Sequence, residues 1–451
     1  MTAWARDAVI YHLYPLGCLG APRRNDADAP VDCRLPALLP WLDHLAGLGA
    51  TALQLGPVFE SASHGYDTLD LRRVDRRLGG NRDLAGLVAA AHACGIRVIL
   101  DGVFHHVGRG HAAFQDVLEK GRASRFAAWF HLDFSRPGPR GEPFSYADWR
   151  GHDDLVKLNT ENPETRDCLL GAAAGWIEEF GIDGLRLDAA DVLSHDFQAV
   201  LAARCRALKP DFWLLGEVIH GDYSAWTGAG GLDSVTNYVL HKALWSAHND
   251  ANYFELAHTL NRQFGPQGDC RGLMLANFAD NHDTMRIASR LKTPAHLYPL
   301  HLLLFALPGI PVIYYGSEAG IAGKADAVNH DWPLRPALTP AELARAAPHP
   351  DLAAAIARFA ALRAAHPALR AGDYETLHVA PRSFAFLRRS GGETALVAVN
   401  AGAKETRLRL RHEALGDLAF ADALNPGEGA RARGGRLEVR LFPNWGAVLT
   451  A

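Results

Sequence analysis

The sequence predicts an α/β fold: a (β/α)8 barrel with an inserted subdomain after its third strand and a C-terminal antiparallel β-sandwich domain. Over residues 1–365, short apolar runs alternate with stretches of helical periodicity, which is the pattern of parallel βαβ units. One gap between two apolar runs is too long for a single helix. Beyond residue 366 the chain changes to short alternating segments separated by glycine pairs, which is typical of antiparallel strands.

Eight apolar runs are predicted to be the strands of the barrel, which is the number that this fold requires. The sixth run is the weakest, because it offers only a serine and a valine. In chain order the runs cover residues 9–13, 52–55, 98–100, 184–187, 213–215, 234–235, 273–275 and 312–315.

Helical periodicity is clearest in three connecting stretches, which cover residues 81–94, 162–180 and 195–208. Asn81 and Asn162 are predicted as N-caps, because an asparagine side chain accepts hydrogen bonds from the free amides of a first helical turn. Gly95 and Gly181 follow the first two stretches and are expected to end them.

The domain limits follow from changes in residue composition and pattern along the chain. Residues 107–158 mix glycine, proline and aromatic residues in irregular order, so they are predicted to form a subdomain on the carboxyl face of the barrel. Residues 366–451 are assigned to the β-sandwich domain. The barrel then consists of residues 1–106 and 159–365.

Composition excludes several classes of function. A net charge of −4 and a pI near 6.6 leave no basic footprint for nucleic acid or an anionic membrane. No apolar run reaches the roughly 18 residues of a membrane span. Residues 1–7 lack the basic and apolar regions of a signal peptide, so a cytoplasmic protein is expected. The six scattered cysteines indicate reduced thiols, and the oligomeric state stays open.

Carboxylates follow several of the predicted strands, at the end where barrel enzymes hold their active sites. Asp101 ends the third run, Asp188 the fourth and Glu217 the fifth, and Asp283 follows the seventh. Two carboxylates on neighbouring strands are the minimum for glycoside hydrolysis, in which one attacks and the other donates a proton. The residues alone leave a second interpretation open, namely salt-bridge partners or metal ligands.

Arg186 precedes Asp188 by two residues, so both side chains point to the same face of a strand. A neighbouring guanidinium lowers the pKa of a carboxyl group, so Asp188 is expected to stay ionised, as a nucleophile must. Glu217 has to carry a proton to act as an acid, so its pKa is expected to be raised.

His105 and His106 come shortly after Asp101 and suggest a metal site. Adjacent residues on a strand point to opposite faces, however, so two neighbouring histidines rarely bind one ion. One functional and one structural histidine is the favoured interpretation. A metal-dependent hydrolase that uses Asp101, His105 and His106 stays as an alternative. Tyr66, in the loop after the second run, offers a ring face on which a sugar can stack.

Taken together, these features resemble the α-amylase family, glycoside hydrolase family 13, over nearly the whole chain. The resemblance is closest to the neopullulanase, cyclomaltodextrinase and maltogenic amylase group, without the N-terminal domain of that group. It rests on motifs in the family's order at residues 56–60, 64–67, 101–106, 155–159, 184–188, 216–218, 280–283 and 309–316.

The resemblance implies a retaining reaction on α-glucosidic bonds. Asp188 would be the nucleophile, Glu217 the general acid/base, and Asp283 a third acid that binds sugar hydroxyls and supports the transition state. It further implies a set of substrate-binding residues, namely Tyr66, Asp67, Asp101, His106, Arg186, His220, His282 and Arg335.

The chain departs from the family in three informative places. His105 replaces an asparagine that ligates calcium in many secreted members, so the usual calcium site looks incomplete and no metal or cofactor is expected. Asp191 and Val192 replace the Lys-His pair of starch-degrading α-amylases. Asp67 and Arg335 resemble a pair that can clamp the terminal sugar in exo-acting relatives, and the alternative is that Asp67 structures its loop and Arg335 is a surface residue. These departures favour small substrates over starch.

The sequence therefore predicts a hydrolase of α-1,4-glucosidic bonds in short linear or cyclic maltooligosaccharides, with an oligosaccharide as its only expected partner. Besides the metal-dependent hydrolase, three alternatives remain: an α-glucan transglycosylase, an exo-acting α-glucosidase, and a non-catalytic sugar-binding protein. The last is disfavoured because Asp188, Glu217 and Asp283 are all present.

Overall fold

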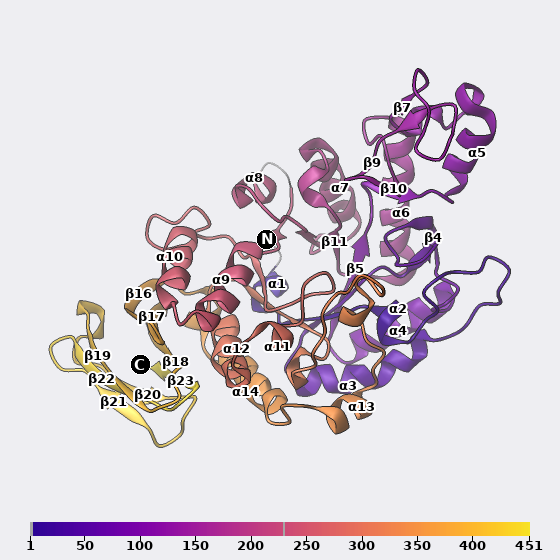
Figure 1. Ribbon diagram of the computed structural model, residues 1–451. Helices are drawn as coiled ribbons and strands as arrows, with labels where there is room; N and C mark the ends of the chain where they lie inside the picture. Colours follow the sequence, from indigo (N-terminus) through magenta and orange to yellow (C-terminus); the bar gives the residue numbers. More distant parts are fainter. Residues whose placement is uncertain (1–2, 229–230) are drawn as a thin grey trace.

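The computed structural model describes residues 3–228 and 231–451. Met1 and Thr2, the first two of residues 1–7 considered above, lie outside the described residues. Eight parallel strands form the central sheet (Figure 1). They are β1 (Ile10–Leu13), β2 (Ala52–Leu55), β5 (Arg97–Gly102), β11 (Gly184–Leu187), β12 (Trp213–Gly216), β13 (Ser234–Val235), β14 (Ala276–Phe278) and β15 (Ile310–Tyr314).

The sheet order is β13-β12-β11-β5-β2-β1-β15-β14, so each strand pairs with its neighbours in chain order. Its two edges meet through a parallel bridge between Thr236 and Ala276, which brings the sheet close to a closed barrel. The fold class predicted from the sequence is confirmed, including the weak sixth strand.

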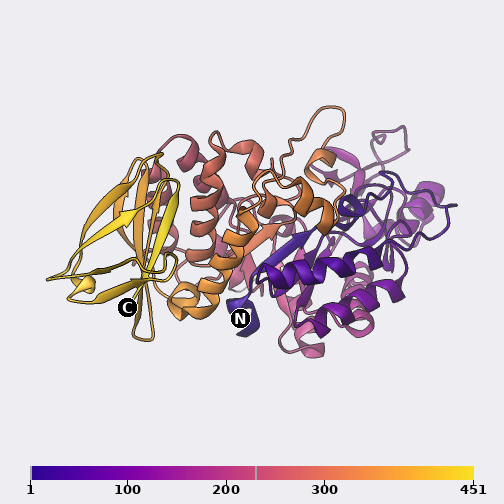
Figure 2. The same cartoon turned by 90° about the horizontal axis from the view of Figure 1, so that it is seen from below.

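Helices surround the strands, and Figure 2 shows them as a layer around the sheet. The longer ones are α3 (Leu39–Gly47), α4 (Asn81–Ala93), α6 (Pro163–Phe180), α7 (His195–Leu208), α9 (Tyr238–Asn249), α10 (Tyr253–Phe264), α12 (Leu297–Ala306) and α14 (Leu352–Ala365). The shorter ones are α1 (Ala3–Asp7), α2 (Pro15–Cys18), α8 (Tyr223–Thr227), α11 (Ile287–Arg290), α13 (Pro340–Ala346) and α15 (Pro367–Ala371).

The helix ends agree with the sequence signals in one case and shift in another. The side chain of Asn162 caps α6 by accepting a hydrogen bond from the amide of Thr165, and Gly181 ends that helix in a left-handed conformation. In α4, Gly80 is the N-cap instead of Asn81. The Asn81 side chain accepts a hydrogen bond from the amide of Val74, so it holds the preceding strand to the helix.

The seventh strand lies three residues later than predicted. Residues 273–275 precede it, and β14 consists of Ala276, Asn277 and Phe278. The sequence hides this strand because its middle residue is polar. Asn277 is fully buried, and its side-chain amide donates to the carbonyl of Pro308 while its oxygen accepts from Asn237.

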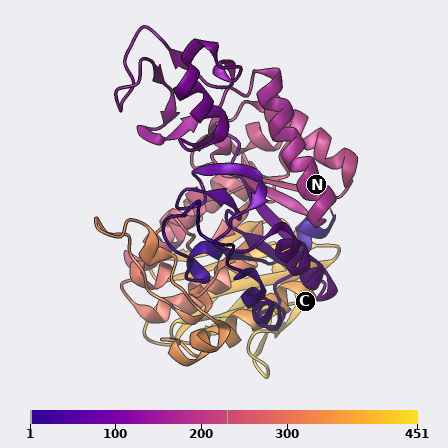
Figure 3. The same cartoon turned by 90° about the vertical axis from the view of Figure 1, so that its right-hand side faces the viewer.

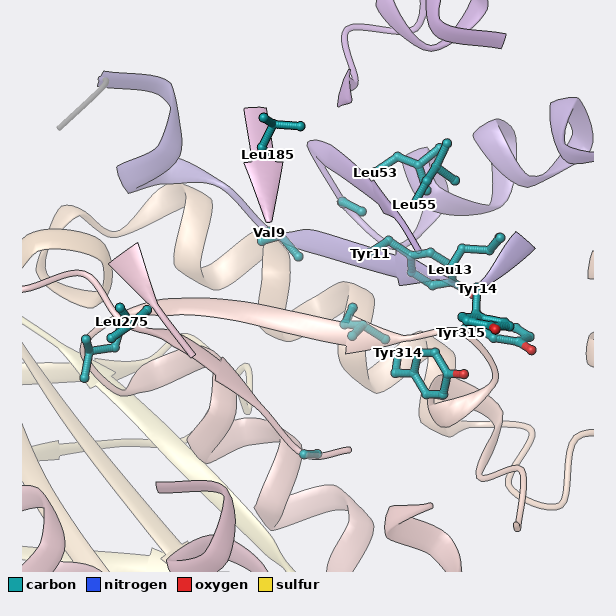
Figure 4. Close-up of a cluster of buried hydrophobic side chains, with 14 of the residues drawn as sticks. Val9, Tyr11, Leu13, Tyr14, Leu53, Leu55, Leu185, Leu275, Tyr314 and Tyr315 are labelled. Carbon is teal, nitrogen blue, oxygen red and sulfur yellow. The ribbon is translucent and has the colours of Figure 1, made fainter. Parts of the chain in front are cut away.

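Alternate residues of each strand point to different layers of the core. Ile10, Ile99 and Trp213 belong to a compact cluster inside the barrel. Figure 4 shows Tyr11 and Leu13 of β1, and Val9 just before it, in the larger cluster that lies between the strands and the helices. This alternation leaves the inward-facing residues at the carboxyl ends of the strands available for a site.

A small subdomain separates β5 from α6. It contains α5 (Ala112–Lys120) and two small antiparallel sheets. One sheet has the order β6 (His106–Gly108), β10 (His152–Lys157), β9 (Asp148–Trp149), and the other pairs β7 (Leu132–Asp133) with β8 (Ser145–Tyr146). Figure 3 shows this subdomain rising from one side of the barrel. A separate two-stranded sheet of β3 (Phe59–Ser61) and β4 (Thr68–Val74) follows β2.

The C-terminal region is an antiparallel β domain on the opposite side of the barrel from the inserted subdomain (Figure 1). Six strands form one sheet in the order β16 (Glu375–Ala380), β17 (Ser383–Ser390), β18 (Glu393–Asn400), β23 (Trp445–Thr450), β20 (Ala419–Asp422), β21 (Gly429–Arg431). The second sheet pairs β19 (Thr406–Arg411) with β22 (Arg436–Leu441), and an apolar cluster lies between the two sheets.

A buried arginine of β17 connects this domain to the barrel. Arg388 donates hydrogen bonds to the backbone carbonyls of Ala306, Leu369, Gly372 and Asp373. Ala306 ends α12, where free carbonyls and the helix dipole favour a positive charge. Burial lowers the pKa of Arg388 to about 9.

Candidate active site

The site is built at the carboxyl ends of the barrel strands around one guanidinium group. Arg186 on β11 pairs in register with Asp101 on β5, so both side chains point into the barrel. Nη1 of Arg186 donates to both carboxylate oxygens of Asp101, at 2.8 and 2.9 Å. The same nitrogen lies 3.0 Å from Oδ1 of Asp188, which follows β11. The predicted closeness of Arg186 and Asp188 is present in the structure.

Glu217 is the third carboxylate on Arg186. It follows β12, and its Oε2 lies 2.9 Å from Nη2 of Arg186 and accepts the amide hydrogen of Ala189 at 3.0 Å. Its other oxygen, Oε1, is 3.3 Å from the hydroxyl of Tyr238. Both carboxylate oxygens therefore have fixed donors, which hold the side chain in one orientation.

The protonation expected for Asp188 needs a correction. Burial raises the pKa of Asp188 well above its usual range, and the charge of Arg186 only partly opposes this effect. The physical reason is that Arg186 shares one positive charge among three buried carboxylates, Asp101 and Glu217 included. The sequence gives Arg186 only one visible partner, and this is why the expected lowering is wrong.

Asp283 lies in the loop after β14, together with His282. Its Oδ2 is 2.9 Å from Nε2 of His282, and its Oδ1 accepts from Nη2 of Arg335 at 2.9 Å. Burial would raise the pKa of Asp283, but His282 and Arg335 outweigh it and hold that pKa below its usual range. Asp283 is therefore a fixed negative charge that faces the same cavity as Asp188.

Arg335 is held by more than Asp283. Its Nε donates to the backbone carbonyl of His282 at 3.1 Å, and its Nη1 donates to the hydroxyl of Tyr14 at 3.2 Å. The guanidinium also lies over the Tyr14 ring, 4.5 Å from its centroid. Tyr14 directly follows β1 and is a site residue that sequence reasoning missed, since its position just past a strand end was the only available signal.

Tyr66 and Asp67 lie in the loop between β3 and β4. The Tyr66 hydroxyl donates to Oδ2 of Asp101 at 3.1 Å and contacts Nε2 of His282. The Tyr66 ring stacks on the His282 ring, with centroids 5.5 Å apart. Asp67 accepts from the hydroxyl of Ser63 at 2.6 Å, and its buried Oδ1 has no hydrogen-bond partner among the described residues.

His105 and His106 do not point to opposite faces as expected. Their Nδ1 atoms are 3.2 Å apart, because His105 lies in a bend between β5 and β6 where the alternation of a strand does not apply. Burial lowers the pKa of His105 to about 4 and that of His106 to about 3, so both rings are neutral. A buried imidazole that faces a second imidazole does not fit the oxygen-rich calcium site of the family.

The cavity at this end of the barrel has a volume of about 520 Å³, within the usual range of small-molecule sites. The inserted subdomain contributes Trp149, His152 and Leu155 to its wall. Several predicted site residues line it, namely Tyr66, His106, Asp188, Glu217, Asp283 and Arg335. Four other predicted site residues are buried behind this lining, namely Asp67, Asp101, Arg186 and His282.

His220 and Asp191 stand apart from the other predicted residues. His220 is exposed and, among the described residues, is not one of those that line the cavity. Asp191 lines the cavity, and its backbone amide donates to the carbonyl of Glu217 at 3.3 Å. Burial and the neighbouring Glu217 raise the pKa of Asp191.

Tyr238 and Trp149 are further residues beside the cavity. The position of Tyr238 follows only from the fold, whereas Trp149 is one of the aromatic residues that the sequence offers as subsite candidates. Tyr238 begins α9 and bridges the side chains of Asn281 and Glu217. The Trp149 ring stacks against that of His106, with centroids 5.9 Å apart. Neither sequence position carries a strong motif, although Trp149 belongs to the aromatic residues of the insert.

Within the described ranges 3–228 and 231–451, no group of three or more His, Cys, Asp or Glu side chains could hold a metal ion. Over the same ranges, no helix is long and apolar enough to cross a bilayer.

Acids at the carboxyl ends of barrel strands, grouped around one arginine and open to one cavity, define a glycoside hydrolase of the barrel class. The comparison with protein families agrees, since the alpha amylase catalytic domain matches residues 25–335. The chain belongs to the α-amylase family and is an α-glucan hydrolase similar to cyclomaltodextrinases.

Three relatives illustrate the similarity. A cyclomaltodextrinase from a Bacillus species is 34% identical over 418 residues, which cover 88% of this chain and 73% of that protein. The cyclic α-maltosyl-(1→6)-maltose hydrolase from Arthrobacter globiformis superposes with a TM-score of 0.81 at 28% identity, over 100% of this chain and 99% of that one. The debranching enzyme from Nostoc punctiforme gives a TM-score of 0.83 at 27% identity, with the same coverage of both chains.

Proposed function

We propose that this protein hydrolyses α-1,4-glucosidic bonds of short linear or cyclic maltooligosaccharides with retention of configuration, through a covalent glucosyl-enzyme on Asp188. The observation that carries the proposal is the relation between Asp188 and Glu217. They follow Leu187 and Gly216, which are paired in register on adjacent strands, and they bind one guanidinium. Adjacent strands lie about 4.8 Å apart, which suits the 5 to 5.5 Å carboxyl separation of retaining enzymes.

The chemistry runs in two steps. In the first, Glu217 gives its proton to the glycosidic oxygen while a carboxylate oxygen of Asp188 attacks the anomeric carbon, so the leaving sugar departs with a free hydroxyl. In the second, Glu217 takes a proton from water, the hydroxyl adds to the anomeric carbon from the face that the leaving sugar left, and Asp188 is released as a carboxylate. Two inversions give net retention.

The other residues act on the sugar and on the charge that develops. Asp283 stays ionised beside Arg335 and His282, so it stabilises the oxocarbenium-like transition state and accepts hydroxyl hydrogens. Tyr66 offers its ring to the sugar face, and Nε2 of His106, which is buried without a partner among the described residues, is free to bind a hydroxyl. The substrate-binding role proposed for Asp67 rests on the family resemblance, because its side chain is buried behind the residues that line the cavity.

Arg186 and Asp101 are proposed to act as a buried frame behind the nucleophile. The role given to His220 rests on the family resemblance alone, because its side chain is exposed.

The substrate class is supported by relatives and by the size of the cavity. Relatives are named cyclomaltodextrinase, neopullulanase and maltogenic α-amylase, and the structure of one solved relative is a complex with cyclic α-maltosyl-(1→6)-maltose. A cavity of about 520 Å³ suits a small oligosaccharide better than an open groove for a polymer.

A product profile tests the proposal. The protein is incubated with maltose, maltotriose, β-cyclodextrin, pullulan, trehalose and starch, and the products are separated by chromatography. Fast release of glucose and maltose from maltotriose or cyclodextrin, with the α anomer formed first in the NMR spectrum, is expected. First formation of the β anomer contradicts retention, and products longer than maltotriose indicate glucosyl transfer instead of hydrolysis.

Two further assignments are part of the proposal. We propose domain limits at 1–106 and 159–365 for the barrel, 107–158 for the inserted subdomain and 366–451 for the β-sandwich. A cytoplasmic location is also proposed. A relative from Bacillus subtilis, named intracellular maltogenic amylase and 33% identical over 349 residues, supports it.

A further inference from the structure

Two loops from neighbouring strands meet at one rim of the active-site cavity. The first loop comprises residues 19–34, after β1 and α2, and the second comprises residues 321–331, after β15. Figure 3 shows the orange segment between β15 and α13 standing out from the body of the barrel. Seven of their residues or near neighbours line the cavity. We call four of them the rim wall, namely Arg23, Val328, Asn329 and Trp332.

Arg23 joins the two loops. Its Nη1 donates to Oδ1 of Asn329 at 3.0 Å, and its guanidinium lies 5.5 Å from the centroid of the Trp332 ring. Trp332 in turn meets the ring of Tyr14 edge to face, with centroids 6.5 Å apart. The rim wall is therefore continuous with Tyr14 and Arg335, which hold Asp283 from the same side.

The first loop is anchored close to Arg23. Arg77 forms a buried ion pair with Asp75, and its Nη1 donates to the carbonyl of Pro22, directly before Arg23, at 2.9 Å. The same nitrogen donates to the carbonyl of Ser63 at 2.7 Å. Arg77 is buried and fully hydrogen-bonded, so it holds the backbone directly before Arg23 in place.

The second loop carries its own turn. Oδ1 of Asp326 accepts the backbone amides of Val328 and Asn329, and Asp326 forms a β-bridge with His330. His330 has a φ of 50°, a left-handed conformation that a non-glycine residue adopts only when its surroundings hold it there. Val328, at the tip, is 84% exposed and offers no hydrogen bond to a passing sugar chain.

The rim wall faces Glu217 from across the barrel. β1 and β12 are four strands apart in both directions around the ring of eight, so the loop after β1 and Glu217 after β12 lie on opposite sides of the mouth. In the proposed mechanism the leaving sugar departs beside Glu217, which protonates it. The rim wall therefore bounds the other side, where the glucosyl unit that bonds to Asp188 and any units attached to it must lie.

We infer that Arg23, Val328, Asn329 and Trp332 form a barrier that shortens the glucosyl side of the cleft and selects short linear chains over cyclic or polymeric glucans. This inference rests on the proposed function and specifies its substrate. A ring, or the interior of a polymer, has to extend on both sides of the bond that breaks, so a barrier on one side discriminates against it. Such a repulsive element gives specificity without adding a contact to the preferred substrate.

Arg23 and Asn329 provide the test. The kcat/KM values for maltotriose, β-cyclodextrin and amylose are measured for the wild type, Arg23→Ala, Asn329→Ala and the double variant. Opening the rim is expected to raise the kcat/KM for β-cyclodextrin relative to that for maltotriose by about tenfold. The kcat/KM for amylose relative to maltotriose is expected to rise as well. The double variant is expected to exceed neither single variant appreciably, because the two residues form one link.

Arg122→Ala is the matched control. Arg122 is an exposed arginine that lies over an aromatic ring, Phe134 at 4.3 Å, outside the cavity lining. Its substitution is expected to leave both ratios unchanged. The inference is overturned if the wild type prefers cyclodextrin to maltotriose, or if the kcat/KM ratios stay constant in Arg23→Ala. Cleavage of maltotriose in the same experiment still upholds the proposed function.

Failure of the proposed function has a different signature. A wild type that cleaves none of these glucans refutes the proposed function, and the rim wall is then judged by calorimetric binding of maltotriose and β-cyclodextrin to the same proteins. A tenfold gain in relative affinity for the ring in Arg23→Ala supports the barrier, and an unchanged relative affinity refutes it.

Discussion

The guanidinium of Arg186 lies 3.0 Å from the carboxylate of Asp188, yet the pKa of that carboxyl is raised. The two facts are compatible because Arg186 binds three carboxylates, each desolvated in the barrel mouth. In a buried cluster of one positive and three negative groups, the carboxyl groups titrate together and not as independent residues. The carboxyl of Asp188 is therefore less acidic than its contact with Arg186 alone would suggest, because its pKa is raised by burial.

The position of Arg186 predicts a shift in the acid limb of the pH profile. Activity requires ionised Asp188, so activity is lost as the pH falls through the pKa of that group. Arg186 lowers this pKa, so Arg186→Lys, which cannot reach three carboxylates with one planar fork, is expected to move the acid limb of kcat/KM to higher pH by about one unit. Initial rates on maltotriose from pH 4 to 8 measure it.

Arg97→Lys is the control for that shift. Arg97 pairs with Asp183 at the amino end of β5, at the far end of the barrel from the cavity. Its replacement is expected to leave the acid limb in place. A limb that moves equally in both variants would show that general loss of stability, and not the charge beside Asp188, causes the shift.

Glu217 and Asp188 are expected to differ in their dependence on the leaving group. Glu217→Gln removes the proton donor, so kcat/KM for maltotriose should fall by roughly 10²- to 10⁴-fold. Fluoride leaves without a proton, so the first step on α-maltosyl fluoride should be nearly unaffected. Asp188→Asn should abolish turnover of both substrates, because no covalent intermediate forms. Equal losses on both substrates in Glu217→Gln would contradict its role as the acid.

Buried histidines predict that stability falls as the solution becomes acidic. Burial lowers the pKa of His248 to about 3, so between the ordinary value near 6.5 and pH 3 the unfolded chain binds a proton that the folded chain does not. Folding is then disfavoured, by roughly 2 kcal/mol at pH 5 for such a group. His106, His105 and His241 add to the trend in the same direction.

His248→Gln tests this contribution. His248 donates from Nδ1 to the carbonyl of Leu244, and its Nε2 accepts from the hydroxyl of Tyr253, so an amide side chain can replace part of both bonds. The decrease of Tm between pH 7 and 5 is expected to be smaller in this variant than in the wild type. His258→Gln, on an exposed part of α10, is expected to keep the wild-type slope.

Arg388 is expected to matter for stability and not for catalysis. Arg388→Met removes the donors of four backbone carbonyls where the C-terminal domain meets α12, two of these contacts being buried and two partly buried, so the free energy of unfolding should fall by about 3 kcal/mol or more. Arg389→Met, at the next position, breaks only partly exposed ion pairs with Asp373 and Glu375 and should cost at most about 1 kcal/mol. Chemical unfolding measures both, and an equal loss would refute the distinction.

The fold could be predicted from the sequence because its repeating pattern is local. Apolar runs of four or five residues and helices with clear caps recur along the chain, and β11 and α6 are found where these signals place them. β14 was misplaced because Asn277 is a buried polar residue in a strand. Its partners, Asn237 and the carbonyl of Pro308, come from other parts of the chain and are invisible to a local pattern.

The candidate site could be predicted in part. Asp188, Glu217 and Asp283 each follow a strand, and parallel strands bring their carboxyl ends to one edge. Tyr14, Tyr238 and the link between Arg23 and Asn329 could not be found in this way, because each acts through a residue that is distant in sequence. Arg23 and Asn329, for example, are 306 positions apart along the chain.

The sequence by itself determined the order of strands and helices and the acidic residues that follow the strands. These features depend on periodicity and on neighbours within a few residues. Only the tertiary structure decided that Arg186 serves three carboxylates, that His105 turns toward His106, and that Arg23 bridges two loops. Charge and hydrogen bonding in a buried site depend on every group within a few ångströms, and the folded chain draws those groups from all of its strands.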